Sequence, residues 1–254
     1  MSTGPRVVGT GPNRVLAFHG WFGSSAGWGH FPEYVDQEQF SYAFLDCRGY
    51  GRRKDVTGEY TMEEISADAL AAADALGWDT FHLLGHSMGA FAMQHLLVAA
   101  PERVQKLYSL SGVPATGGQL DDQVLGMFSA APQSLEARIG LTHFATGSRL
   151  PDSFAARIAT ESQANSTVEA FAGHLLPWAR GTDISEQVRG LKHPVKALVG
   201  EYDPALTEEV SRATWLEFFP DCEIGTIPNT GHYAMYEAPA WLAASVEEFF
   251  LRRV

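Results

Sequence analysis

The chain has 254 residues, 45% of them hydrophobic, and a formal net charge of −12 at pH 7. This acidic balance argues against nucleic acids and anionic membrane surfaces as partners. No apolar run reaches the roughly 18 residues of a membrane-spanning helix, and the first residues lack the apolar segment of a signal peptide. We therefore expect a cytoplasmic protein with no nucleic-acid and no membrane partner.

The length and the cysteine content are those of a reduced protein with one large core. A chain of this size buries roughly three quarters of its unfolded surface, so it needs neither disulfide nor metal to fold. The two cysteines, Cys47 and Cys222, are expected to be free thiols. We expect a single α/β domain that carries an insertion.

Strand-like and helix-like segments alternate in the first part of the chain. The predicted strands cover residues 15–18, 42–46, 81–84 and 104–110. A helix over 61–76 starts with Thr61 and Glu64 in capping-box spacing, and a second helix over 88–100 stops before Pro101. This alternation predicts a mostly parallel sheet with helices on both faces.

The alternation breaks between residues 114 and 192, where glycine and proline separate helical segments. The predicted helices of this stretch cover 120–130, 135–144, 153–163 and 168–179. The pattern then resumes with strands 195–199 and 222–227 and helices 208–219 and 239–251. The sequence therefore predicts a core of residues 1–113 and 193–254, with a helical lid of residues 114–192 inserted between two strands. Ligands are expected beyond the carboxyl ends of the strands.

The most informative motif is Gly85-His86-Ser87-Met88-Gly89, between a predicted strand and a predicted helix. Glycines on both sides let the backbone turn sharply and hold the serine at the start of the helix, as in a nucleophile elbow. A match of this kind arises by chance with a probability of about 0.15 for this composition. The function therefore depends on what accompanies Ser87.

A nucleophilic serine needs a base and an acid that orients the base. His232 lies in a glycine-hinged loop after the last predicted strand, and Asp203 follows the strand over 195–199. Both segments reach the same edge of the sheet as Ser87. Glu201 competes with Asp203 for the role of the acid, although the loop register favours Asp203. The other histidines show no ligand spacing and are interpreted as structural or surface residues.

An oxyanion hole requires two N–H donors close to the reacting carbonyl. The amide of Met88, directly after the nucleophile, is one candidate. The second is the amide of Trp21 in His19-Gly20-Trp21, where the first long strand ends.

Together these motifs resemble the α/β-hydrolase superfamily, most closely its bacterial carboxylesterase, enol-lactonase and perhydrolase branch. The order Ser87, Asp203, His232 is that of α/β-hydrolases. The resemblance spans the chain except for the lid, and it implies the α/β-hydrolase fold with a Ser-His-Asp triad. A serine at the elbow excludes the aspartate-dependent branches. A Ser-Gly-Gly-Gly-Pro-Gly oxyanion loop, common in C–C hydrolases, is absent, which makes C–C cleavage a weaker alternative.

Aromatic side chains near the oxyanion loop, in the lid and beside His232 predict an apolar substrate pocket. The candidates are Phe22, Trp28, Phe128, Phe144, Trp178 and Tyr233. The lid arginines (Arg138, Arg149, Arg157 and Arg180) are scattered, which argues against a strongly anionic substrate.

These observations favour a serine carboxylesterase that cleaves a small or medium apolar ester or lactone through an acyl-enzyme. No metal and no organic cofactor is expected. Two alternatives stay open: a ligand sensor with slow turnover, and a lyase or C–C hydrolase on the same triad. The natural substrate and the oligomeric state stay open as well, a homodimer included.

Overall fold

The computed structural model describes residues 3–252 and contains one sheet of seven strands in the order β1-β3-β2-β4-β5-β6-β7. The strands are β1 (Arg6–Val8), β2 (Asn13–Phe18), β3 (Phe40–Phe44), β4 (Phe81–His86), β5 (Val104–Leu110), β6 (Val195–Gly200) and β7 (Glu223–Ile227). Only β1 runs antiparallel to its neighbour, and all other pairs are parallel. The predicted mostly parallel sheet is confirmed.

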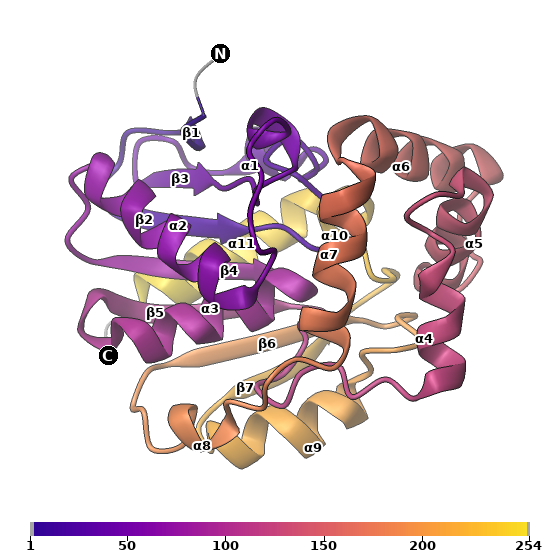
Figure 1. The fold of residues 1–254 in the computed structure, drawn as a ribbon. Coiled ribbons are helices and arrows are strands. Elements are labelled where there is room, and N and C mark those ends of the chain that lie inside the picture. The colour runs from indigo at the N-terminus through magenta and orange to yellow at the C-terminus, as the bar shows by residue number, and fades with distance from the viewer. Residues whose placement is uncertain (1–2, 253–254) are drawn as a thin grey trace.

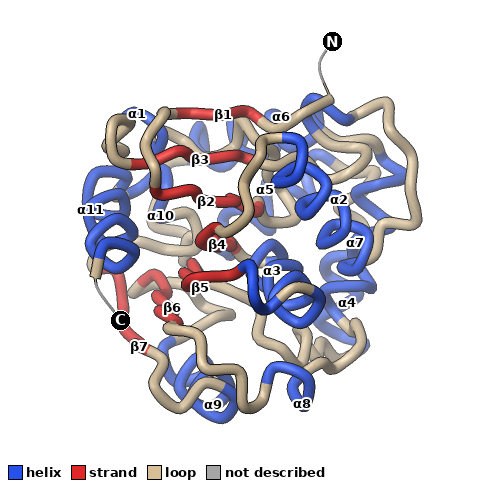
Figure 2. Tube along the Cα trace, turned by 90° about the vertical axis from the view of Figure 1, so that its left-hand side faces the viewer, coloured by secondary structure: helices blue, strands red, loops and turns tan. Residues whose placement is uncertain are grey.

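Helices cover both faces of this sheet, as Figure 2 shows for α1 and α11 on one side and α2 and α3 on the other. The helices outside the β5–β6 connection are α1 (Phe31–Tyr34), α2 (Met62–Ala75), α3 (Met88–Ala99), α9 (Glu208–Phe218), α10 (Ala234–Glu237) and α11 (Pro239–Leu251). Two short 3₁₀ helices span Gly51–Arg53 and Pro101–Arg103. The alternation of strands and helices along the chain thus produces the expected three layers.

Two hydrophobic clusters, one on each face, hold these layers together. In β2, Leu16 and Phe18 belong to the cluster formed with α2 and α3, whereas Val15 and Ala17 belong to the one formed with α1 and α11. All four side chains are essentially inaccessible to solvent. Because both faces of a parallel sheet are covered, its strands are continuously apolar instead of alternating with polar residues.

The connection from β5 to β6 is formed by helices, with one isolated bridge between Ser166 and Tyr50, while the division into a core and a lid of residues 114–192 stays a prediction. It contains α4 (Asp122–Ser129), α5 (Leu135–Ala145), α6 (Asp152–Asn165), α7 (Val168–Ala179) and α8 (Ser185–Val188). Figure 1 shows α4 to α7 gathered on the side toward which β2 and β3 point. Below, α4 to α8 are called the helical insertion. Side chains of Asp121, Ser134 and Thr167 cap α4, α5 and α7, which explains why these helices begin within two residues of the predicted positions.

The structure adds elements that the sequence pattern did not predict, namely β1 and the short helices α1, α8 and α10. Each has only three or four residues, too few to show a period. Cys47 and Cys222 are buried and unpaired, in line with the expectation of free thiols. Within residues 3–252, no helix is long and apolar enough to cross a membrane.

Candidate functional site

Ser87 occupies a strained turn between β4 and α3. Its backbone has φ 54° and ψ −120°, a conformation that a side chain-bearing residue adopts only at a free-energy cost of about 1–3 kcal/mol. Hydrogen bonds hold the turn in place, because the Ser87 N–H donates to the Leu110 carbonyl at 3.0 Å. The Ser87 carbonyl in turn accepts from the N–H groups of Ala90 and Val113 at 3.0 and 3.1 Å.

The two glycines of the motif are required by close packing around this turn. A Cβ atom at position 89 would lie 2.3 Å from the Phe18 carbonyl oxygen. A Cβ atom at position 85 would lie 2.6 Å from the Cα atom of Ala90. Because both contacts are to backbone atoms, neither glycine can be replaced without moving the turn that presents Ser87.

Asp203 and His232 form a short hydrogen bond, with 2.6 Å between Asp203 Oδ2 and His232 Nδ1. The other carboxylate oxygen of Asp203 accepts from the N–H groups of Ala205 and Leu206, both at 3.1 Å. Burial alone would raise the pKa of Asp203, but the His232 ring and these donors outweigh it and lower the pKa. The carboxylate therefore stays ionised and holds the imidazole by its Nδ1–H group.

The backbone of His232 is fixed as firmly as its ring. Its N–H donates to the Ala145 carbonyl at 3.0 Å, and its carbonyl accepts from His86 Nε2 at 2.9 Å. Burial, with a further contribution from His232, lowers the pKa of His86 well below its ordinary value. His86 is thus neutral near pH 7, with the proton on Nε2, and places no positive charge beside the His232 ring.

Glu201, the competing acid, lies in the same loop region but does not bond to the His232 ring. Its carboxylate accepts from the Asn229 N–H at 2.8 Å, which ties the loop after β7 to the loop after β6. Ser87 and His232 line one cavity, yet no hydrogen bond joins their side chains anywhere in the described structure. In unliganded enzymes such bonds commonly tighten only when substrate binds.

The loop after β2 orients the peptide between Gly20 and Trp21. The Gly20 carbonyl accepts from His19 Nδ1 at 2.7 Å and from the Gly23 N–H at 2.8 Å. His19 Nε2 accepts from the Cys47 N–H at 3.2 Å, so the proton of this neutral, buried ring must sit on Nδ1. Since N–H and C=O of one trans peptide point in opposite directions, these bonds fix the direction of the Trp21 N–H.

The large cavity at this edge of the sheet has a volume of about 550 Å³. It contains Ser87, Asp203, His232 and Trp21 together with five of the predicted pocket aromatics, Phe22, Phe128, Phe144, Trp178 and Tyr233. Further walls that the sequence pattern did not reveal come from the loops after β5 and β6 and from α4, α5 and α9. These are Val113, Pro114, Thr116, Gly117, Gly118, Gln119, Leu120, Val124, Leu141, Ala145, Ala205, Leu206, Val210 and Thr214.

Trp28 is the one predicted pocket residue that the structure places elsewhere. Its side chain is buried in the cluster with α1 and α11, where its ring packs against Phe31 and Phe44 at centroid distances of 5.8 and 5.5 Å. The chain turns at residues 24–29 before α1, and this turn directs Trp28 to the opposite face of the sheet. The prediction was wrong because proximity in sequence to the oxyanion loop does not determine which face a loop residue reaches.

No lysine and no arginine is among the residues that line the large cavity. Arg149 instead pairs with Glu237 at 3.0 Å, and Arg180 pairs with Asp122 at 2.5 Å. Arg138 is buried within the helical insertion, and Arg157 lies over the rings of Phe154 and Tyr236. The cavity is therefore suited to uncharged groups.

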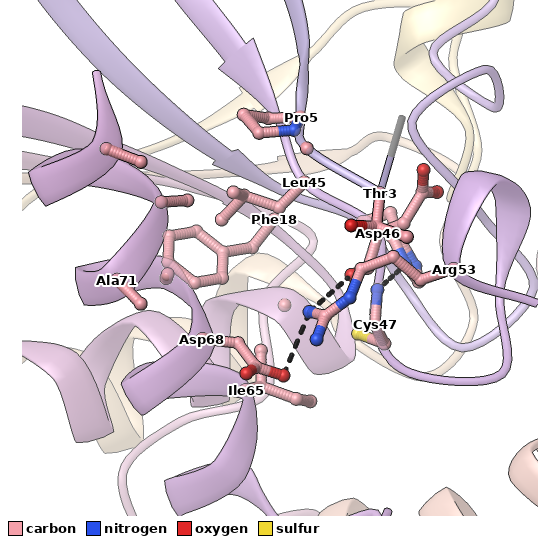
Figure 3. A pocket seen from close by; sticks show the side chains of 16 residues that line it. Thr3, Pro5, Phe18, Leu45, Asp46, Cys47, Arg53, Ile65, Asp68 and Ala71 are labelled. Atoms are coloured by element: carbon pink, nitrogen blue, oxygen red, sulfur yellow. Dashed lines mark hydrogen bonds and ion pairs between the residues drawn. The ribbon is translucent and has the colours of Figure 1, made fainter. Parts of the chain in front are cut away.

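A smaller cavity of about 240 Å³ lies between α2 and the segment after β3 (Figure 3). Arg53 reaches across to Asp68, with 2.9 Å between Nη1 and Oδ2. Cys47 also lines this cavity, but burial raises the pKa of its thiol far above the usual range. A thiol that stays protonated is a poor nucleophile, so this cavity offers no second centre for covalent chemistry. Within residues 3–252, no group of three or more potential ligands is arranged to hold a metal ion.

Comparison with known proteins gives a family match over most of the chain. The model of the alpha/beta hydrolase fold family matches residues 13–239. A 2-hydroxy-6-oxononadienedioate/2-hydroxy-6-oxononatrienedioate hydrolase of Burkholderia vietnamiensis is 25% identical over 96% of this chain and 89% of its own length. A pimeloyl-[acyl-carrier protein] methyl ester esterase of Pseudoalteromonas atlantica is 22% identical over 89% of this chain and 90% of its own length.

Among solved structures, the esterase EaEST of Exiguobacterium antarcticum aligns with a TM-score of 0.82. The alignment covers 97% of this chain and 94% of the esterase, at 17% sequence identity. At that identity the likeness shows the fold alone.

Proposed function

Because the chain belongs to the α/β-hydrolase family, we propose that it is a serine carboxylesterase that cleaves a small or medium apolar ester or lactone. The observation that carries this proposal is the 2.6 Å bond between Asp203 and His232, in the cavity that also contains Ser87 on its strained turn. Family membership establishes a hydrolase fold, whereas the proposed catalytic roles rest on these side chains and the choice of ester chemistry rests on the cavity around them.

The proposed reaction proceeds through an acyl-enzyme. Ser87 Oγ attacks the ester carbonyl carbon while His232 Nε2 accepts the serine proton. His232 then delivers that proton to the leaving alcohol oxygen as the carbon–oxygen bond breaks. Water, deprotonated by the same nitrogen, hydrolyses the acyl-Ser87 ester and restores the serine. Asp203 keeps the imidazole in the correct tautomer and stabilises the imidazolium.

The tetrahedral intermediate is stabilised in this proposal by the N–H groups of Trp21 and Met88. Met88 is the first residue of α3, where helix N–H groups have no partner within the helix. Neither amide donates to another group among the described residues. Trp21 lines the cavity, and Met88, which directly follows Ser87, lies at the positive end of the α3 dipole.

The composition of the cavity supports an uncharged acyl group. A volume of about 550 Å³ lies within the usual range for small-molecule sites, and the walls are mostly aliphatic and aromatic. Its titratable residues are His86, Asp203, His232 and Tyr233, all accounted for by the hydrogen bonds of the site or kept neutral by burial. Burying a carboxylate substrate among them without a cation would be costly.

A C–C hydrolase is the second candidate, because the relative from Burkholderia vietnamiensis carries such a name. The name describes a substrate with two carboxylates. Carboxylates are normally held by arginine or lysine, and no such side chain lines this cavity. The cavity therefore favours ester cleavage over cleavage of a dicarboxylate.

The test is hydrolysis of p-nitrophenyl esters from acetyl to dodecanoyl, measured beside γ-butyrolactone-type lactones and a hydroxy-oxo-dienoate. We expect rapid turnover of uncharged esters or lactones, loss of turnover in Ser87→Ala, and full turnover in Ser129→Ala, a surface control on α4. Turnover of the dienoate alone would favour the C–C hydrolase. A single burst without turnover would favour the ligand sensor.

A further inference from the structure

Arg138, on α5, is a buried cation without a partner anion. The residue is only 1% exposed, and its guanidinium donates to the Ala131 carbonyl at 2.9 Å. It also donates to the hydroxyl groups of Ser162 and Ser166 at 3.0 and 3.2 Å. No ion pair involves Arg138 within residues 3–252. Burial of a charge without a counter-ion costs folding free energy, so an apolar side chain of similar size would be more stabilising at this position.

The guanidinium forms the first layer of a three-layer stack. Its central carbon lies 3.6 Å from the centroid of the Phe171 ring, on α7. The ring of Trp21 stacks on Phe171 as well, with 4.0 Å between centroids and 23° between planes. Two groups this close to one centroid must lie on opposite faces of the ring. Phe171 is therefore held between the cation and the indole.

A hydrogen bond adds to the stack on the Trp21 side. The indole Nε1–H donates to the Phe171 carbonyl at 2.7 Å, so one residue of the helical insertion fixes both the plane and the rotation of the indole. The two bonds to the Gly20 carbonyl hold the peptide before Trp21 from the side of the core. The residue that supplies the proposed oxyanion N–H is thus clamped at its side chain by the insertion and at its peptide by the core.

We propose that Arg138 is a positioning residue for the oxyanion hole, acting through Phe171 on the indole of Trp21. This inference rests on the proposed function, because it explains the buried Arg138 cation by the role of the Trp21 N–H in the proposed oxyanion hole. The guanidinium is planar and can cover the Phe171 ring while each of its three nitrogens donates a hydrogen bond at the edge, which an ammonium group cannot do. The stack keeps the indole, and with it the Trp21 N–H, from shifting as charge develops on the substrate oxygen.

The test is a double-mutant cycle of Arg138→Met and Trp21→Leu, with p-nitrophenyl butanoate as substrate. Both variants keep the Trp21 backbone N–H. We expect Arg138→Met to lower kcat about tenfold with KM nearly unchanged, less than the 10²–10³-fold loss for removal of a whole donor. In the Trp21→Leu background the same change should have little further effect. Independent, multiplying effects would overturn the proposal, and so would an unchanged kcat in Arg138→Met.

A matched control is Arg157→Met, another arginine of the insertion that lies over aromatic rings, but those of Phe154 and Tyr236. It should leave kcat unchanged. Rates are expressed per active site, counted with a fluorophosphonate that labels the nucleophile, so loss of folded protein does not lower them. If Arg138→Met does not fold, Phe171→Leu removes the middle layer and is expected to give the same loss of kcat.

Binding of butylboronic acid, which mimics the tetrahedral intermediate, separates positioning from a merely structural role. Its affinity should fall in Arg138→Met by the same factor as kcat. Equal affinity in wild type and variant would contradict the proposal. Failure of the wild type to react with the fluorophosphonate would instead refute the serine mechanism itself, so the two failures are distinguishable.

Discussion

The carbonyl oxygen of Ala145, the last residue of α5, accepts the backbone N–H of His232 at 3.0 Å. A helix of the insertion is thus bonded directly to the loop of the proposed catalytic base. On the other side of the cavity, α7 holds the indole of Trp21 through the Phe171 carbonyl. Movement of α5 or α7 away from the core would therefore break contacts that the site needs.

The helix α4 is the exception, and we predict that it is the mobile part of the insertion. It contains no buried residue, although Phe128 packs against Trp21 and Trp178, and at the surface Arg180 donates to the Leu120 carbonyl at 2.7 Å and pairs with Asp122. In hydrogen–deuterium exchange, α4 amides should exchange faster than those of α5 and α7. Arg180→Gln should accelerate exchange in α4 further, while Arg157→Gln should not. Equal protection of all three helices would contradict a mobile α4.

Replacement of the proposed orienting acid should affect the rate far more than the stability. Asp203→Asn is expected to lower kcat by about 10⁴-fold, because an amide stabilises the wrong imidazole tautomer and no imidazolium. Glu201→Gln is the matched control, since its partner is the Asn229 amide and not the His232 ring. It should retain most activity. The assignment would be reversed if Glu201→Gln were the inactive variant. Steady-state kinetics on one ester compares the two.

Acid should lower the free energy of unfolding over a pH range that is set by the pKa values of buried histidines. Burial, helped by Lys106, lowers the pKa of His82 to about 4, and its ring is stacked on Phe250. Above about pH 6.5 the ring is neutral in both the folded and the unfolded chain. As the pH falls toward 4, only the unfolded chain binds the proton. The free energy of unfolding should therefore fall, by about 3 kcal/mol at most from this residue.

Urea unfolding at pH 7 and pH 5 measures this effect. His82→Phe should reduce the difference between the two pH values. The remaining difference should come from other buried histidines, among them His174, whose pKa burial also lowers to about 4, and His86. An identical pH dependence in wild type and His82→Phe would show that the ring is protonated in the folded state.

The size of the apolar cavity should determine the preferred acyl length. Val124 on α4 lines the cavity, and Val124→Trp should fill part of it. We expect the ratio of kcat/KM for octanoyl over acetyl p-nitrophenyl esters to fall about tenfold or more. Trp28→Phe is the control, because Trp28 packs in the opposite core and should alter stability but not this ratio. A changed ratio in Trp28→Phe would indicate that Trp28 does contribute to the substrate pocket.

The parts of the fold that the sequence predicted are those determined by local patterns. The turn at Ser87 depends on two glycines between an apolar strand and a helix, and the helix at Met62 depends on the Thr61 cap, which accepts from the Glu64 N–H at 3.1 Å. In each case, the residues that form the signal lie within a few positions of one another in the sequence. The parallel sheet then follows from the alternation of these elements.

Most of what the sequence did not predict depends on contacts between distant segments. The capping box itself is altered, because the Glu64 carboxylate accepts from the N–H groups of Glu59 and Tyr60. The stack of Arg138 on Phe171 joins two helices, and no periodicity reveals that such a pair meets. The position of Trp28 likewise depended on the path of a loop. Non-local packing decides the positions of Arg138 and Trp28, whereas the altered capping box follows from the local course of residues 59–61, which no periodicity reveals.

The central claim is that Ser87 is the nucleophile, and covalent labelling tests it most directly. The protein is treated with a fluorophosphonate at neutral pH and digested. The masses of its peptides are then measured by mass spectrometry. The account predicts one phosphonyl group per chain, on the peptide that contains Ser87, and none after heat unfolding or in Ser87→Ala. Labelling of a different residue, or turnover of esters without any labelling of Ser87, would contradict it.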